Sequence, residues 1–307
     1  MCEVIKWDSW EGGRFNCLEE CMESWYSFSI IALFLMGTQR FLYKVSAEKK
    51  CNTAWTTFSF MATVAILSSI LFVVRGESVA SIRFLLFVAL INSAAFLLAT
   101  VTHIEALKNI PASVAYPIIR LSAVFVVIFS ILFFKDRPSL YQVIGILLAM
   151  VVIVVLTRES GDETTSYGKR RTGFLCIFVA LIAGAVAIIS SKFAAMHTNK
   201  MAFIAISYIA SSFFALGLRS KLQTEEANES PRDAILIGLV MGLINLAGYY
   251  AYLKALSTGP LSIITAITGM HFIIAIILSA LIYKEKLMPS RILGISLSVA
   301  SIILLRL

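Results

Sequence analysis

Ten stretches of mainly apolar residues, each about as long as a bilayer is thick, follow one another along the chain. They cover residues 26–45, 54–74, 84–107, 112–133, 139–157, 173–194, 200–218, 234–254, 261–283 and 290–306. A helix needs roughly 20 such residues to cross a hydrocarbon core of about 30 Å, and it satisfies its own backbone groups there. The alternating polarity that is typical of membrane strands does not occur. The pattern predicts an all-α integral membrane protein with ten transmembrane helices.

Composition supports lipid as the solvent of these helices. Of the 307 residues, 59% are hydrophobic and only 14% are charged, against about 45–50% and about 25% in soluble domains. The net charge of +8 comes from short basic clusters between the apolar stretches, and no nucleic-acid-binding motif accompanies them. Such clusters set membrane orientation or meet anionic headgroups. The expected partner is therefore the lipid bilayer, with no nucleic acid.

Two segments without long apolar runs divide the chain. Residues 158–172 fall at its midpoint, and we interpret them as a linker between the halves 26–157 and 173–307. Residues 1–25 hold six acids and no apolar run, so they do not form a signal peptide. They are either a cytoplasmic tail or, if translation starts at Met22, not translated in vivo.

The two halves repeat each other. A shift of 149 aligns 106–156 with 255–305 without a gap, and 14 of these 51 pairs are identical. Apolar bias explains matched Leu and Ile, but it does not place Pro111 opposite Pro260 or Lys135 opposite Lys284. Because each half has five spans, the second half is inverted in the membrane. Inverted repeats place a site at the bilayer midplane and let it open alternately to either side.

The repeated motif is AL-x3-P-x-S, an apolar helix, [KR]-[DE]-[KR], and a helix that opens near glycine. It occurs as ALKNIPAS…FFKDRPSLYQVIGILL and as ALSTGPLS…IYKEKLMPSRILGISL. This resembles the EamA-type repeat of the drug/metabolite transporter superfamily, from about residue 24 onward. The resemblance implies two inverted five-helix repeats around a central cavity, and secondary transport, which we expect to be export, of a small organic metabolite. Where that family usually has small residues and tryptophan, Gly37 is followed here by Thr38, Gln39 and Arg40.

Polar side chains inside apolar spans are costly, so they usually face a cavity or a partner. The candidate cavity residues are Arg120, Tyr116, His271, Thr268, Thr265, Asn245, Tyr249, Asn92 and Gln39. Arg120 lies nine residues into the fourth span and either binds an anionic group of the solute or forms a structural ion pair. Tyr116 precedes it by one turn, on roughly the same face.

The other candidates each have a structural alternative. Thr265, Thr268 and His271 recur every three residues on the ninth span, where Ser and Thr also join helices by hydrogen bonds. His271 is either a solute or proton ligand or a buried neutral histidine. Arg40 lines the cavity or extends to the interface, and for Lys44 we favour the interface. Gly238 and Gly242 form GxxxG, which favours close helix packing.

Buried acids are nearly absent. Only Glu105 lies inside a predicted span, so an anionic, zwitterionic or neutral solute is favoured over a cation. No P-loop and no common hydrolase motif occurs, and the cysteine spacing fits no zinc site. We therefore expect no enzyme activity, no metal and no cofactor. A membrane sensor or scaffold without transport, or a membrane enzyme, remains the alternative.

Orientation and location follow from charge and targeting. The family resemblance favours both termini in the cytoplasm, whereas the excess of Lys and Arg in the alternate set of loops favours the opposite orientation. The absence of a targeting peptide suits a multi-pass protein of the cell membrane, such as a bacterial inner membrane. The sequence leaves open whether two copies pair as a homodimer.

Overall fold

The computed structural model describes residues 11–49, 51–109, 118–119, 121–158, 170–217, 231–284 and 289–307, and within them every regular element is a helix. In chain order these are α1 (Glu11–Glu48), α2 (Thr53–Arg75), α3 (Ile82–Asn109), α5 (Ser122–Phe129), η1 (Ser130–Phe134), α6 (Leu140–Arg158), α7 (Arg170–His197), α8 (Lys200–Gly217), α10 (Pro231–Thr258), α11 (Leu261–Gly269), α12 (Phe272–Tyr283) and α13 (Pro289–Arg306). The all-helical prediction is confirmed for this part of the chain.

Six of the spans in the described residues are long and apolar enough to cross a membrane. They are Ser24–Ser46, Trp55–Arg75, Ile82–His103, Arg171–His197, Arg232–Thr258 and Leu261–Tyr283. Four shorter apolar helical segments lie at the remaining expected positions, namely Ser122–Phe134, Leu140–Val152, Lys200–Phe213 and Ile292–Arg306. The chain is therefore a multi-pass membrane protein, and the number of ten crossings stays a prediction.

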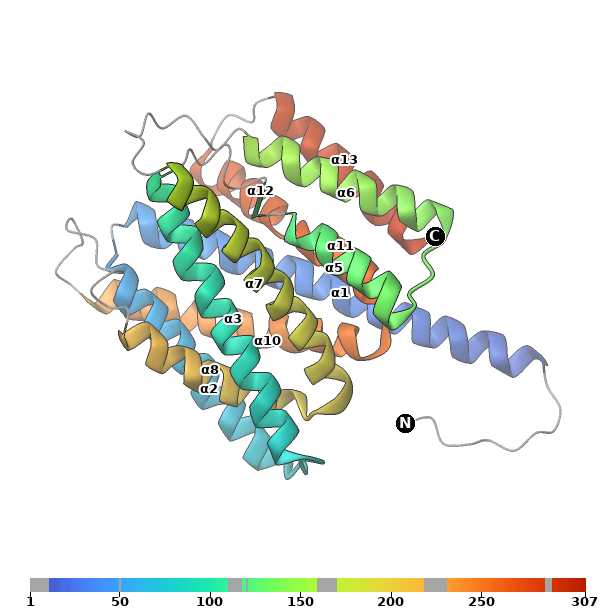
Figure 1. The fold of residues 1–307 in the computed structure, drawn as a ribbon, viewed down its shortest axis with the longest axis horizontal. Coiled ribbons are helices and arrows are strands. Elements are labelled where there is room, and N and C mark those ends of the chain that lie inside the picture. The colour runs from blue at the N-terminus through green and yellow to red at the C-terminus, as the bar shows by residue number, and fades with distance from the viewer. Residues whose placement is uncertain are drawn as a thin grey trace.

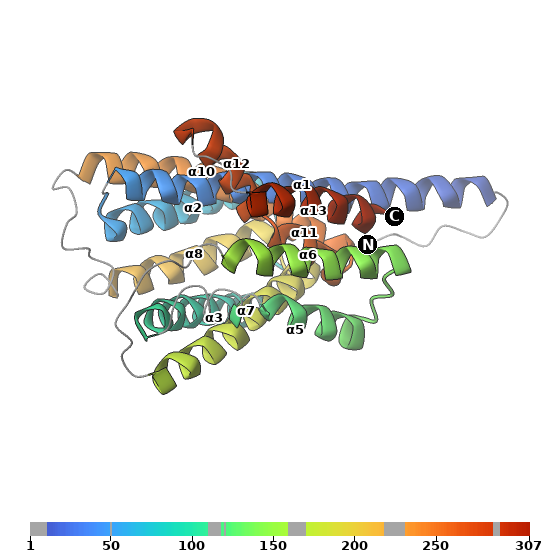
Figure 2. The same ribbon diagram turned by 90° about the horizontal axis from the view of Figure 1, so that it is seen from above.

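The helices pack in pairs, and each pair joins one helix from the first repeat with one from the second. By order along the chain, α1 corresponds to α7 and α3 to α10. In agreement with this, α1 packs along α10, and its equivalent α7 packs along α3. α2 packs against its own equivalent α8, and α6 against its own equivalent α13. Figure 1 shows the pair α6 and α13 at one edge of the bundle and the pair α2 and α8 at the other, and Figure 2 gives the view from above. The first turns of α1 project beyond the other helices.

The first membrane span begins and the last helix, α13, ends at the same end of the bundle, which we call the terminal face. There the Tyr26 hydroxyl of α1 donates to the carbonyl of Ile302 in α13 at 2.9 Å, and the Arg306 guanidinium lies 6.0 Å from the Tyr26 ring centre. Because successive helices run in opposite directions, α2, η1, α7 and α10 end at this face. In the same way α1, α3, α8 and α12 end at the opposite face.

The two repeats share a backbone turn where the basic motif begins. Lys135, after η1, has φ of 57°, and Lys284, after α12, has φ of 53°. They are the non-glycine residues with positive φ among those described, and the sequence repeat aligns one with the other. A left-handed residue commonly ends a helix because its amide reaches back to the last carbonyls. The repeat seen in the sequence is therefore also a repeat in backbone conformation.

The predicted ninth span is not one continuous helix, and its break has an equivalent in the first repeat. α11 ends at Gly269, and the amides of Met270 and His271 donate to carbonyls three residues earlier, at 3.1 Å. The Met270 amide bonds Ile267 and its carbonyl accepts from Ile273. Leu121, its equivalent in the first repeat, makes the same two bonds to Ile118 and Val124. Glycine lowers helix stability at the turn after α11. The turn at Leu121, directly before α5, has the same two bonds without a glycine beside it.

Close packing at the predicted GxxxG pair is confirmed. A Cβ added at Gly242 of α10 would lie 2.6 Å from Cβ of Thr63, and one added at Gly238 would lie 2.7 Å from Cβ of Ser59, both on α2. Without side chains at these positions, the two backbones approach closely, which maximises van der Waals contact between helices in lipid.

Gly242→Ala should therefore push α10 away from α2 and lower the free energy of unfolding by about 1–3 kcal/mol, the usual cost of overpacking. Thermal unfolding of the purified protein in detergent would measure this as a lower midpoint. The matched control is Gly217→Ala, because no atom lies within 4 Å of a Cβ added there. Equal midpoints for the two variants would contradict the proposed packing.

Candidate functional site

The break between α11 and α12 is held against α1 at a glycine. A Cβ added at Gly37 would lie 2.5 Å from the carbonyl oxygen of His271 and 2.4 Å from Cβ of Ile274. The equivalent contact in the other repeat joins Gly184 of α7 to Ser122, beside the break before α5, at a looser 3.7 Å. Each first helix of one repeat thus packs on the broken helix of the other repeat. This crossing lies between the two faces of the bundle.

A chain of hydrogen bonds between buried and half-buried side chains starts beside this crossing. The Asn245 amide of α10 donates to Oε1 of Gln39 at 2.8 Å, and its Oδ1 accepts from the Tyr208 hydroxyl of α8 at 2.6 Å. Gln39 also hydrogen-bonds Tyr43. The structure thus brings together two predicted site residues, Gln39 and Asn245, from different repeats.

The chain continues through aromatic rings to the α3 and α7 side. The Tyr208 ring lies 6.0 Å from that of Tyr249, whose hydroxyl is 3.1 Å from Oγ of Ser191 on α7. Asn92 of α3 donates to Oγ of Ser191 at 3.0 Å and to that of Ser190 at 2.9 Å. We call Gln39, Tyr43, Asn92, Ser191, Tyr208, Asn245 and Tyr249 the central polar cluster. It connects α1, α3, α7, α8 and α10.

The predicted stripe on the ninth span divides into separate roles. Thr268 donates to the Ile264 carbonyl of its own helix at 2.7 Å, rather than to another helix. Nδ1 of His271 is 2.7 Å from the Thr268 carbonyl, so the imidazole folds back across the break. Thr265 is buried, and its hydroxyl has no hydrogen-bond partner within the described structure. A solute that reached this point would find a hydroxyl able to donate and accept.

At the terminal face, an acid from the first repeat caps a helix of the second. Oδ2 of Asp136 accepts from the backbone amide of Ser262 at 3.1 Å and from its hydroxyl at 2.9 Å, and it also accepts from the Ser130 hydroxyl. Ser262 lies in the first turn of α11, where amides have no intrahelical partner and a negative charge is stabilised by the helix dipole. All residues of α11 from Leu261 to Thr268 are buried.

A lysine closes the same face beside this cap. Lys192 of α7 is 6% exposed, and its ammonium donates to the carbonyls of Leu256 at 2.7 Å and Gly259 at 2.8 Å, where α10 ends. The end of a helix is a favourable place for a cation. The ammonium also lies 5.5 Å from the ring centre of Phe134. Asp136 therefore joins the end of η1 to α11, and Lys192 joins α7 to the end of α10 and contacts Phe134 of η1 at the terminal face.

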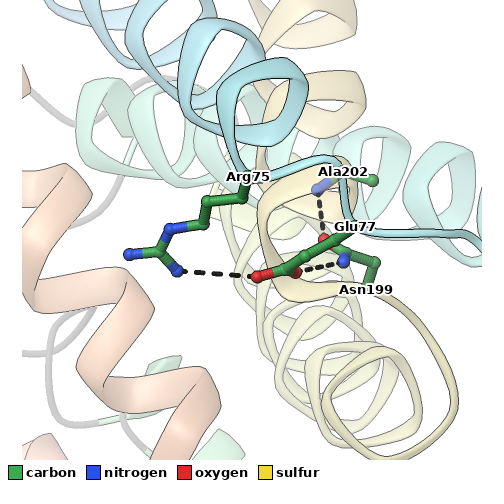
Figure 3. Close-up of polar contacts among 4 residues, drawn as sticks. All are labelled: Arg75, Glu77, Asn199 and Ala202. Carbon is green, nitrogen blue, oxygen red and sulfur yellow. Dashed lines mark hydrogen bonds and ion pairs between the residues drawn. The ribbon is translucent and has the colours of Figure 1, made fainter.

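A further polar contact at this face joins the turn after α2 to the start of α8, as Figure 3 shows. Glu77 forms an ion pair with Arg75 at 3.7 Å and accepts from the Asn199 amide. Oδ1 of Asn199 in turn accepts from the Ala202 amide at 3.0 Å, which caps α8. Arg75 and Glu77 lie at the surface, so we assign this contact a structural role.

Sequence reasoning identified part of this arrangement. Arg120 and Tyr116 lie outside the described residues, and their role stays a prediction. Tyr208 and Asp136 were not predicted. Tyr208 is the one tyrosine of the mainly apolar span 200–218, and that signal could have found it. Asp136 sits in the repeated basic motif, but only the fold shows that it reaches the other repeat. Lys44, which we expected at the interface, instead donates to Oγ of Ser279 at 2.5 Å.

The turn within the ninth span, the exchanged packing pattern and the polar cluster between the repeats describe a helical membrane protein built from two related halves. The sequence profile of the EamA-like transporter family matches residues 23–158 and again residues 171–307. The chain belongs to the EamA-like transporter family, and it is a membrane transporter of the drug/metabolite type. This family consists of transporters rather than enzymes, so the sensor, scaffold and enzyme alternatives gain no support.

Comparison with solved structures agrees on the fold. One crystal structure, described only as that of a protein, superposes with a TM-score of 0.72, covering 92% of this chain and 96% of that chain at 15% sequence identity. At this identity the likeness concerns the fold alone. No protein of known, curated function matches the chain.

Lys192→Met should destabilise the terminal face, because it leaves two carbonyls at the end of α10 without their charged donor. Hydrogen bonds to charged groups contribute about 1.5–3 kcal/mol each. We expect a lower midpoint of thermal unfolding in detergent than for Lys254→Met, which removes an exposed lysine from the same end of α10. If both variants unfold at the same temperature, Lys192 does not hold this face.

Proposed function

We propose that this chain is a secondary transporter that exports a small organic solute across the cell membrane by alternating access, with both termini in the cytoplasm. The observation that carries the proposal is the pair of equivalent broken helices, each packed on the first helix of the other repeat. Discontinuous helices at a repeat interface are where inverted-repeat transporters bind their solutes. The equivalent turns at Leu121 and Met270 would act as two hinges, one for opening each face of the bundle.

The contacts at the terminal face support a state that is closed there. Asp136 bonds Ser262 across the repeats at this end, and Lys192 of the second repeat lies over the Phe134 ring of the first. α11 is buried along its length from Leu261 to Thr268. At the opposite face the repeat-equivalent lysine, Lys44, already contacts Ser279 of the second repeat. In the mirror-related state the equivalent of Asp136, Glu285, which lies outside the described residues, would complete the same kind of contact there. The solute would then be released when one face closes and the other face opens.

The central polar cluster is the binding region in this proposal. It lies beside the hinge at Gly37, it includes side chains from both repeats, and its groups are amides and hydroxyls. No Asp or Glu is among the buried side chains that the structure describes, and a cationic solute would require one. This supports an anionic, zwitterionic or neutral solute. Arg120 and Tyr116 are further candidates for the same region by their place in the sequence.

Untargeted metabolomics of cells and medium tests the function. Cells that express the wild-type protein should deplete one class of solute internally and accumulate it in the medium, relative to an empty vector. Asn245→Ala should abolish most of this difference, because it leaves Gln39 and Tyr208 without their shared partner. The control is Leu243→Ala on the lipid-facing side of the same helix, 56% exposed, at equal membrane abundance. Identical profiles for wild type and empty vector would contradict transport under the conditions used.

A further inference from the structure

The inner face of α1 changes from packed to solvent-accessible between Leu33 and Arg40. Ile31 and Phe34, 46% and 53% exposed, mark the lipid-facing side of this helix. On the opposite side Leu33 is 3% exposed. Arg40 follows Leu33 by about two turns, so it lies on the same inner side. Arg40 is nevertheless exposed.

Tyr43 shows the same change from buried to exposed along the inner side of α1. It follows Ala32 by about three full turns and therefore lies on the same side of the helix. Ala32 is fully buried, and yet Tyr43 is 37% exposed. The Arg40 guanidinium lies 5.7 Å from the centre of the Tyr43 ring. Because Arg40 and Tyr43 lie on the same side of α1 as the buried Leu33 and Ala32, they face the interior of the bundle and not the surrounding lipid.

Arg40 has no carboxylate partner within the part of the chain that the structure describes, where the ion pairs join Lys49 to Asp233 and Arg75 to Glu77. Arg40 lies inside the apolar span Ser24–Ser46, six residues before its end, and a charged arginine within such a span needs water or a counter-ion to compensate it. The surrounding groups are a tyrosine ring and hydroxyls, none of which neutralises the charge. The guanidinium therefore faces a water-accessible space with its hydrogen-bond donors available.

We propose that Arg40, with Tyr43 and Tyr208 beside it, binds the anionic group of the transported solute. This rests on the proposed transport function and narrows its solute to an organic anion. Arginine offers a planar fork of donors that matches a carboxylate or a phosphate. The amides of Gln39 and Asn245 would contact the polar part of the same solute, and the rings of Tyr208 and Tyr249 its apolar part.

Binding of matched small probes to the purified full-length protein tests this assignment without requiring transport. Benzoate and benzamide have the same ring and nearly the same size, but only benzoate is an anion. Thermal unfolding in detergent should shift upward with benzoate more than with benzamide. Arg40→Gln should weaken benzoate binding by about 10- to 100-fold, the equivalent of one charge-assisted hydrogen bond, and leave benzamide unchanged. Arg40→Lys should retain part of the benzoate preference.

The matched control is Arg83→Gln, which removes an exposed arginine at the start of α3 and should bind benzoate like wild type. The proposal is overturned if folded wild-type protein does not prefer benzoate to benzamide, or if Arg40→Gln binds benzoate as well as wild type does. It is also overturned if phosphatidylglycerol abolishes benzoate binding, because Arg40 would then hold a lipid headgroup. The assay measures binding alone, so a failure of export in cells leaves its result standing.

A second measurement applies if Arg40→Gln does not fold. In a background with all native cysteines replaced by serine, Arg40→Cys should react with a charged, membrane-impermeant thiol reagent, and benzoate should slow this reaction in proportion to its binding. Phe34→Cys on the lipid-facing side of the same helix should react slowly and without any effect of benzoate. Equal reaction rates at the two positions would show that Arg40 does not face water.

Discussion

The rest of the structure depends on one contact between the repeats, in which Asp136 accepts hydrogen bonds from the first turn of α11. In a bilayer, backbone amides at the start of a helix have no water to bond, and leaving them unpaired costs several kcal/mol each. The carboxylate of the first repeat supplies that partner to the second repeat. Lys192 bonds the end of α10 beside it and lies over the Phe134 ring of η1. Separation of α11 from η1 would therefore break the Asp136 bonds to Ser262 and the Lys192–Phe134 contact, while the bonds of Lys192 to α10 could stay intact.

Because the two halves of the chain repeat each other, the structural elements around this contact have equivalents in the other half. The breaks at Leu121 and Met270 occupy equivalent positions in the two repeats, and so do the left-handed turns at Lys135 and Lys284. Their packing differs, however, because Gly37 fits tightly against the second break while Gly184 fits loosely against the first. Two equivalent elements in unequal environments are what one state of an alternating-access cycle requires. The polar cluster lies between them, where it would be reached from whichever face is open.

The sequence predicted the fold well because lipid imposes one simple rule on it. A continuous apolar stretch of about 20 residues can only be a helix there, and the repeat then follows from counting spans. It did not predict the break at Met270, because neither Gly269 nor the polar residues of 261–283 exclude a continuous helix. In the structure this break packs on Gly37. Gln39, Asn245, Tyr249 and Asn92 were predicted because polar groups stand out in apolar spans. The structure joins them in one polar cluster, and their role in binding stays a prediction.

What the sequence could not show is which polar groups meet. Tyr208 links Asn245 to Tyr249 from a helix that has no other sign of a site. The side of α1 on which Arg40 lies can be assigned only once it is known which neighbours, such as Leu33, are buried. The sequence alone does not show this. Asp136 appeared to be an ordinary loop acid. Its contact with Ser262 joins residues 126 positions apart, and no local pattern records such a pair.

The most direct test of alternating access is to measure two distances between pairs of spin labels by double electron–electron resonance, under the same conditions. Labels at Leu132 and Thr258 report on the terminal face, and labels at their equivalents in the other repeat, Leu281 and Asn109, report on the opposite face. Asp136→Asn weakens the contact that closes the terminal face. The account predicts that the first distance then lengthens while the second shortens. Two distances that stay unchanged, or that lengthen together, would contradict it.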